Sequence, residues 1–287
     1  MSGTVREPAV AGRFYPGDSR RLHAFLDEHL VRQGTMCKQH LRALIVPHAG
    51  YPYSGGTAAK GFNLLPTDSF KRIILIGPSH YENFRGICMA PHGFFKTPIG
   101  EMKVDTEAVD HLVSGDHRFT KRVDVHLSEH ALEVELPFLQ RLVPSAMILP
   151  IATGKMTMED ILDISRALLP FWDDETLLVI SSDFTHYGDH FGYYPFLQEH
   201  AQEKLPQLDG GAIDCIKKVD CDAFLTYVEE TGATICGRFG ISVLLRMCEL
   251  NGAPLDVELL EYTTSANITG DYATCVAYAA ISLSRKE

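Results

Sequence analysis

Residues Arg72–His80, RIILIGPSH, form the stretch of sequence that decides the fold. The four consecutive residues Ile73–Ile76 are apolar, and Gly77 and Pro78 follow at once. A short apolar run that ends at such a breaker is typical of a strand buried on both faces, as in a parallel sheet. His80 then places a polar group at the tip of the predicted strand.

The same design recurs in three other stretches of the chain. They are ALIVPHAG (43–50), AMILPIATG (146–154) and LLVISSDFTH (177–186). Three of the four apolar runs are followed by His, or by Asp and His, and these residues are His48, His80, Asp183 and His186. In open α/β sheets, ligands bind at the carboxyl ends of the strands. The sequence therefore predicts one polar site built from these four side chains.

Strand and helix patterns alternate along all 287 residues of the chain. The sequence contains no internal repeat, low-complexity tract or linker. This alternation predicts one α/β domain over residues 1–287, with a mixed, mainly parallel central sheet flanked by helices. The chain is predicted to close with two strands, Val257–Tyr262 and Thr274–Leu283, of which the second is a candidate for the sheet centre.

Glycine and proline decide where two helices are expected to begin or break. Residues 51–56, YPYSGG, are predicted to form a loop before a helix from about Thr57 to Leu65. Backbone N–H groups of such a loop can face an anion or a metal-bound oxygen, and the alternative is a plain tight turn. A later helical pattern, about Phe196–Lys218, is predicted to be interrupted near Pro206–Gly211.

Acidic residues lie at the start of a helix predicted over Ala131–Val143. A loop-borne His130 that enters this helix could reach the polar site, together with the carboxylates that follow it. Acidic side chains in the first turn of a helix are more often solvated. We therefore expect Glu133 and Glu135 to lie in solvent.

Composition argues against two classes of partner. The chain has 26 Lys and Arg residues against 37 Asp and Glu residues, which gives a net charge of −11. This charge, without any basic run, argues against nucleic-acid binding. No apolar stretch approaches the length of a membrane span, and the N-terminal sequence MSGTVREPAV lacks the apolar core of a signal peptide. We therefore expect no membrane partner and a cytoplasmic location.

Seven cysteines are scattered through the chain, at positions 37, 88, 215, 221, 236, 248 and 275. Their odd number and the absence of a Cys-x-x-Cys pair fit neither a disulfide framework nor a zinc ribbon. Cys236 differs from the others because it precedes Gly237 at a predicted helix start and lies beside Arg238. A helix N-terminus and a guanidinium both lower the pKa of a thiol. We therefore expect Cys236 to be the most acidic thiol, able to bind a metal or attack an electrophile.

The strand-end residues allow more than one chemistry. His48 and His80 can converge on a single transition metal, which then needs a third ligand, or each imidazole can simply hydrogen-bond loop backbone. Asp183 and His186 can act as metal ligands or as an acid–base pair. Alternatively, Asp183 caps a turn and His186 lies at the surface. The repeated strand-end placement favours a shared site.

Six blocks of the sequence resemble the signature blocks of a known family. They are AGRFYP (11–16), PHAGYPYSG (47–55), GPSH (77–80), EHALEVELPF (129–138), SSDFTHYG (181–188) and TICGR (234–238). Together they resemble the Memo family, whose bacterial and archaeal members are often labelled AmmeMemoRadiSam system protein B. The resemblance covers nearly the whole chain.

The resemblance implies a fold similar to that of class III extradiol ring-cleaving dioxygenases, which are non-haem Fe(II) enzymes. It implies that His48, His80 and Cys236 ligate the metal, with Asp183 and His186 in the same pocket as catalytic residues. The ring-cleaving enzymes have a carboxylate at the position of Cys236, and the softer thiolate shifts the preference toward copper(I) or zinc. Iron (Fe²⁺) is the expected cofactor, with copper and zinc as alternatives.

These features support three functions. The first is a dioxygenase-like, metal-dependent redox enzyme in which His186 moves protons and Asp183 orients it or binds substrate. The second is a non-catalytic, signalling-type adaptor that reuses the pocket to bind a metal, a peptide or a partner. The third is a metal-assisted hydrolase with Asp183 and His186 as the base. The expected ligand is a small molecule or a peptide, and the family label implies an association with a radical-SAM protein.

Overall fold

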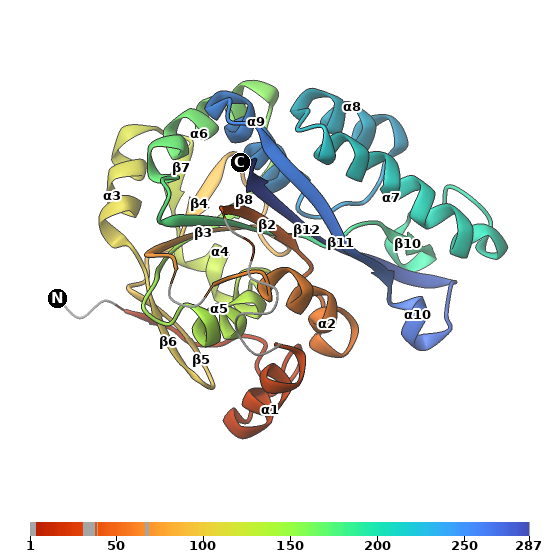
Figure 1. Ribbon diagram of the computed structural model, residues 1–287, viewed down its shortest axis with the longest axis horizontal. Helices are drawn as coiled ribbons and strands as arrows, with labels where there is room; N and C mark the ends of the chain where they lie inside the picture. The colour runs from red at the N-terminus through yellow and green to blue at the C-terminus, as the bar shows by residue number, and fades with distance from the viewer. Residues whose placement is uncertain (1–3, 31–37, 39, 67–68, 287) are drawn as a thin grey trace.

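A mixed nine-stranded sheet runs through the centre of the molecule (Figure 1). The computed structural model describes residues 4–30, 38, 40–66 and 69–286. The strands of the sheet, in spatial order, are β10 (His186–Gly188), β12 (Thr274–Arg285), β2 (Leu41–Val46), β9 (Thr176–Ser181), β3 (Arg72–Pro78), β8 (Met147–Thr153), β4 (Ile87–Met89) and β7 (Phe119–Lys121), and β11 (Leu255–Thr264) pairs with β12.

The centre of the sheet is parallel and its flanks are mixed. Strands β2, β9, β3 and β8 run parallel to one another, whereas β12 is antiparallel to β2 and β4 is antiparallel to β8. The predicted α/β fold with a mixed central sheet is therefore confirmed, and it is consistent with the dioxygenase-like fold that the resemblance implied. Strand β12, the candidate for a central position, pairs with β2, β10 and β11.

Helices cover both faces of the sheet (Figure 1). They are α1 (Ser19–His29), α2 (Tyr51–Phe62), α3 (Thr106–Gly115), α4 (Val123–Leu127), α5 (Leu136–Leu142), α6 (Met158–Leu168), α7 (Ala201–Lys217), α8 (Cys221–Thr231), α9 (Arg238–Asn251) and α10 (Ala266–Thr269). Helix α6 packs on α9, which lies against β3 and β9, whereas α2 lies against β2 and β12 on the other face. Short 3₁₀ helices are η1 (Glu133–Glu135), η2 (Leu169–Phe171), η3 (Asp189–Phe191) and η4 (Gln198–His200). A separate small sheet contains β1 (Val5–Arg6), β5 (Phe94–Thr97) and β6 (Gly100–Lys103).

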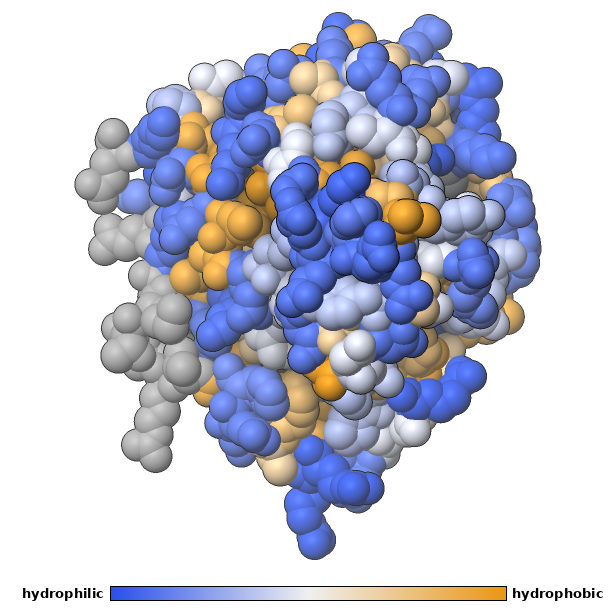
Figure 2. All heavy atoms as spheres, turned by 90° about the vertical axis from the view of Figure 1, so that its right-hand side faces the viewer, coloured by the Kyte–Doolittle hydropathy of each residue, from blue (hydrophilic) through white to orange (hydrophobic). Residues whose placement is uncertain are grey.

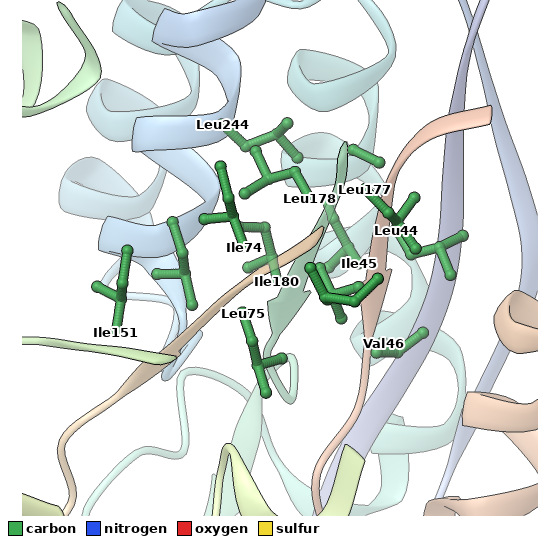
Figure 3. Close-up of a cluster of buried hydrophobic side chains, with 14 of the residues drawn as sticks. Leu44, Ile45, Val46, Ile74, Leu75, Ile151, Leu177, Leu178, Ile180 and Leu244 are labelled. Carbon is green, nitrogen blue, oxygen red and sulfur yellow. The ribbon is translucent and has the colours of Figure 1, made fainter. Parts of the chain in front are cut away.

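The central strands are buried along their whole length because helices cover both of their faces. Every residue of β2 and β9 is buried. Figure 3 shows side chains of β2, β3 and β9, such as Leu44, Ile74 and Leu178, clustered with Leu244 of α9. This two-sided burial explains why the strands read as continuous apolar runs in the sequence.

Hydrophilic side chains predominate on the face that carries α7 and α10, as expected for a chain with a net charge of −11 (Figure 2). The longest of the described helices, α7, has 17 residues. Within the described ranges, no helix is both long enough and apolar enough to span a membrane.

The prediction of a loop over residues 51–56 is wrong, because α2 already begins at Tyr51. Pro52 lies in the first turn of this helix, where its missing N–H leaves no helical hydrogen bond unmade. Gly55 lies inside the helix where it packs against α1, since a Cβ atom placed on it would be 2.7 Å from Phe25 Cζ. Gly55 therefore allows close packing of two helices, and residues 51–56 do not form an anion-binding loop.

The interruption predicted near Pro206–Gly211 is also wrong, because α7 is continuous from Ala201 to Lys217. Gly211 lies where Tyr227 of α8 packs on α7, and a Cβ atom at this position would be 2.3 Å from Tyr227 Cζ. The Tyr227 hydroxyl donates a hydrogen bond of 2.8 Å to the Leu208 carbonyl. Gly211 thus allows close contact between two helices instead of ending one.

Gly210 and Gly211 provide a matched pair for testing this packing. Apart from the backbone of its own helix, no described atom lies within 4 Å of a Cβ atom placed on Gly210. We expect Gly210→Ala to raise the free energy of unfolding by about 0.5–1 kcal/mol, because alanine has the higher helix propensity. Gly211→Ala should lower it by about 1–2 kcal/mol, because the added methyl displaces Tyr227. Urea unfolding measures both changes, and equal effects of the two substitutions would contradict the packing.

Candidate metal centre

The ends of β2 and β3 meet the start of α9 at one edge of the sheet. His48 follows β2, His80 follows β3, and Cys236 lies two residues before α9 begins. The ligand atoms of these three residues all lie within 4.8 Å of one another. Cys236 Sγ is 3.2 Å from His48 Nε2. The structure thus brings together the three residues that the resemblance selected as metal ligands.

The imidazole of His48 is held in one orientation by a contact on the ring nitrogen that faces away from Cys236. Its Nδ1 atom lies 2.8 Å from the Ser181 hydroxyl, which itself donates to the Ala131 carbonyl at 2.6 Å. His48 Nδ1 therefore carries the hydrogen, and Nε2 keeps the lone pair that faces Cys236. Burial and the nearby His80 hold the pKa of His48 well below its usual value, so this ring is neutral.

His80 is held by the carboxylate of Glu129. Its backbone N–H donates to Glu129 Oε2 at 2.6 Å, and its Nδ1 lies 2.9 Å from Glu129 Oε1. Burial would raise the pKa of Glu129, but the hydrogen bond from His80 and the nearby His130 lower it to about 2. Burial would likewise lower the pKa of His80, but Glu129 outweighs it and raises this pKa. His80 Nδ1–H therefore faces Glu129, and Nε2 is left for another partner.

The thiol of Cys236 is not acidic, so that prediction is wrong. Burial, and next the charge of Asp183, raise the pKa of Cys236 well above the usual thiol value. The sulfur accepts a hydrogen bond from the Asp183 backbone N–H at 3.2 Å and donates to the Asp183 carbonyl at 3.5 Å. Arg238, expected to lower the pKa, is exposed and lies over the Phe239 ring at 5.0 Å. A metal that binds this sulfur would displace its proton.

Asp183 and His186 lie beside the three grouped residues and have different partners. Asp183 Oδ1 accepts the backbone N–H of His48 at 2.8 Å, which ties the ends of β9 and β2 together. Burial raises the pKa of Asp183, and the nearby His186 opposes this rise. His186 Nδ1 lies 3.0 Å from the Thr234 carbonyl. Because a carbonyl can only accept, Nδ1 carries the hydrogen and His186 Nε2 keeps a lone pair.

Three glutamates near the start of α5 are buried instead of solvated, so the prediction for Glu133 and Glu135 is wrong. Glu129, Glu133 and Glu135 have exposed fractions of 2%, 0% and 0%. Glu135 Oε1 lies 2.9 Å from the Ser181 hydroxyl, and burial raises the pKa of Glu135 well above the usual carboxyl value. This segment runs beneath the strand ends as the 3₁₀ helix η1 before α5 begins, with Pro137 in the first turn of α5.

Glu133 binds the N-terminal segment to the site. Its carboxylate forms a buried ion pair with Arg6 and accepts the backbone N–H groups of Ala9 and Val10 at 2.7 and 3.0 Å. The Tyr15 hydroxyl donates to the same carboxylate at 2.7 Å. The AGRFYP block therefore packs against the segment that supports His80.

His130 is a buried imidazole that the sequence left as an open alternative. Its ring stacks on His80, with centroids 4.5 Å apart, and lies 5.5 Å from His48. Burial and the nearby His48 lower its pKa to about 3, and within the described ranges its Nδ1 atom has no hydrogen-bond partner. His80, Glu129 and His130 also lie close enough to hold a metal. The Glu129 oxygens, however, already accept four N–H groups, so the group with Cys236 offers the freer donors.

Comparison with known proteins places the chain in a family. The family model for Memo-like protein matches residues 6–282. The chain belongs to the Memo-like protein family. A MEMO1 family protein of Thermococcus onnurineus is 32% identical, over 96% of this chain and 98% of the relative. A MEMO1 family protein of Schizosaccharomyces pombe is 30% identical, over 97% of this chain and 99% of the relative. The family predicted from the sequence blocks is confirmed.

In this Memo-like chain, a pocket of about 390 Å³ opens beside the candidate metal centre. His80 and Cys236 both contribute to its wall, together with the aromatic rings of Phe84 and Phe239. This volume lies in the range of small-molecule sites. The two candidate ligands that line it would hold a metal within reach of a bound molecule.

Asp209 of α7 supports the segment between Asp183 and His186. It is fully buried and accepts the Thr185 hydroxyl at 2.6 Å, the Thr185 backbone N–H at 3.3 Å and the Tyr262 hydroxyl at 2.7 Å. Burial raises the pKa of Asp209 to about 6. No sequence pattern indicated this role, because the residue lies in the part of α7 that was expected to break.

The raised pKa of Asp209 predicts a pH-dependent stability. The carboxyl binds its proton more tightly in the folded chain, with a pKa of about 6 against 3.8, so its contribution is fully present below pH 3.8 and is lost as the pH rises through about 6. We expect the wild type to lose about 2–3 kcal/mol more than Asp209→Asn across this range, because asparagine does not ionise; its Oδ1 can accept from Thr185 and its Nδ2 can donate to the Tyr262 hydroxyl. Urea unfolding at a series of pH values measures this difference. Asp214→Asn, on an exposed position of α7, serves as the control and should run parallel to wild type. A parallel curve for Asp209→Asn would show that Asp209 does not titrate in this range.

Proposed function

We propose that the chain binds one transition-metal ion through His48, His80 and Cys236 and uses it in a redox reaction on a small molecule held in the adjoining pocket. The observation that carries this proposal is the shared orientation of the two imidazoles. Each has its Nδ1 atom engaged, with Ser181 or Glu129, and its Nε2 atom left for a metal. Metal-binding histidines are held in the same way by a partner on the second ring nitrogen.

The donor set fits a transition metal with open coordination positions. Two imidazole nitrogens and one sulfur are three protein donors, as in catalytic sites that leave room for substrate. Iron is the metal we favour from the dioxygenase-like fold, and copper or zinc are alternatives because the sulfur is a soft donor. Bound iron or copper would supply redox chemistry, whereas zinc would supply Lewis acidity alone.

The neighbouring residues of the chain have separate parts in this proposal. His186 has its Nδ1–H fixed by Thr234, so its Nε2 lone pair can accept a proton from a bound molecule. Asp183 holds the His48 backbone and so fixes the distance between two strand ends. His130, which is neutral, stacks on His80 and so packs beside one of the proposed ligands.

Removal of any proposed ligand should abolish metal binding without unfolding the chain. We expect His48→Ala, His80→Ala and Cys236→Ala each to lose most of the bound metal, because two remaining donors bind a transition metal weakly. Elemental analysis of protein purified without oxygen or an affinity metal gives the stoichiometry and identifies the native metal. Cys215→Ala, on α7, is the control and should keep its metal. Full stoichiometry in all three ligand variants would refute the site.

Substitution of His186 tests proton transfer separately from metal binding. We expect His186→Ala to keep the metal but to lower turnover by about 10²-fold or more, as for a lost acid–base group. Metal content and metal-dependent oxygen consumption, with candidate reductants or catechols, are measured in parallel. His190→Ala removes an exposed imidazole four residues away and should leave both unchanged. Loss of metal in His186→Ala would show that His186 is a ligand. Unchanged turnover would show that the role of His186 is structural.

A further inference from the structure

The pocket beside the metal centre contains two basic side chains as well as the candidate ligands. Lys155 and Arg238 line it together with His80 and Cys236. Among the described residues neither cation forms an ion pair, although the chain as a whole carries a net charge of −11. Glu82, the acidic residue in the same wall, lies 3.5 Å from Arg122, which is also paired with Asp124. Lys155 and Arg238 therefore place two positive charges in the pocket wall against the one carboxylate of Glu82.

Lys155 follows β8, which is the one strand among the parallel strands β2, β9, β3 and β8 whose end carries no candidate site residue. Its backbone N–H donates to the Phe84 carbonyl at 2.8 Å, and its carbonyl accepts the Gly86 N–H at 3.0 Å. Gly154 makes this approach possible, because a Cβ atom there would lie 2.2 Å from the Phe84 oxygen. The backbone of Lys155 is thus fixed at the pocket wall while its side chain is exposed.

Arg238 is placed by the start of α9, two residues after Cys236. Its guanidinium lies over the Phe239 ring, 5.0 Å from the centroid, and the side chain is exposed. A guanidinium stacked on an aromatic ring keeps its N–H groups free for a carboxylate or a phosphate. The rings of Phe84 and Phe239 add apolar surface to the same wall.

We propose that the pocket takes a small organic anion, whose carboxylate or phosphate group is held by Lys155 and Arg238. Its apolar body lies against Phe84 and Phe239, and its reacting end faces His80. This inference adds the substrate class to the proposed function. The part of it that concerns the reacting end of the substrate rests on that function. Recognition of the charged group depends on Lys155 and Arg238 alone, so it operates without a metal.

Binding of matched aromatic probes to the metal-free full chain tests the proposal. Dissociation constants of benzoate, phenyl phosphate and benzamide are measured by ligand-observed NMR at low ionic strength, where charge effects are least screened. We expect at least one of the two anions to bind about fivefold more tightly than benzamide. The ranking of benzoate and phenyl phosphate shows which oxyanion the pocket prefers. Lys155→Met and Arg238→Met should each remove most of the anion preference, whereas Lys60→Met, on the exposed side of α2, should retain it.

The outcomes separate this inference from the proposed function. Lys155→Met and Arg238→Met should bind zinc with wild-type stoichiometry, whereas His80→Ala should lose the metal and keep the preference for anions. The inference is overturned if neither anion binds more tightly than benzamide, or if the preference survives in both cation variants. Either result would leave the proposal that His48, His80 and Cys236 bind a metal unaffected.

Discussion

The buried carboxylate of Glu129 is the group on which the candidate metal centre depends. It accepts the backbone and ring N–H groups of His80 at 2.6 and 2.9 Å, and the backbone N–H groups of His130 and Ala131 at 2.9 Å. A carboxylate that accepts several N–H bonds stays ionised when buried. Because any of these donors would be costly to leave unpaired, the loop after β3 keeps one conformation. His80 is thus oriented, at both backbone and ring, before a metal binds.

The segment that contains Glu129 also supports the other imidazole and anchors the N-terminus. Ser181 holds the ring of His48 and contacts both the Ala131 carbonyl and Glu135. Arg6 pairs with Glu133 and donates to the backbone carbonyl of Glu129 at 2.6 Å. Segments far apart in sequence therefore share one buried polar network. The hydrogen bonds of this network restrict the side chains that they join, while Glu135 Oε2 has no hydrogen-bond partner among the described residues.

The strand-end histidines could be predicted because β2, β3 and β9 are buried on both faces, so the apolar runs show where each strand ends. The buried glutamates could not, because an acid near a helix start has the same local pattern whether it meets water or a distant N–H. The prediction that the Cys236 thiol is acidic failed for the same reason. Gly237 and Arg238 are neighbours in sequence, whereas burial and the charge of Asp183 raise its pKa. Local patterns locate polar groups, and long-range partners decide their protonation.

The third candidate ligand reaches the histidines because α9 packs closely on the end of β9. A Cβ atom placed on Gly237 would lie 2.4 Å from Ser182 Cβ, so a larger residue would force the helix away from the strand. The Gly237 N–H also donates to the Ser182 hydroxyl at 3.0 Å. The distance of 3.2 Å between Cys236 Sγ and His48 Nε2 therefore follows from the missing side chain of Gly237. The sequence placed this glycine at a helix start, but its contribution to the site is the close approach of α9 to β9, which depends on the tertiary fold.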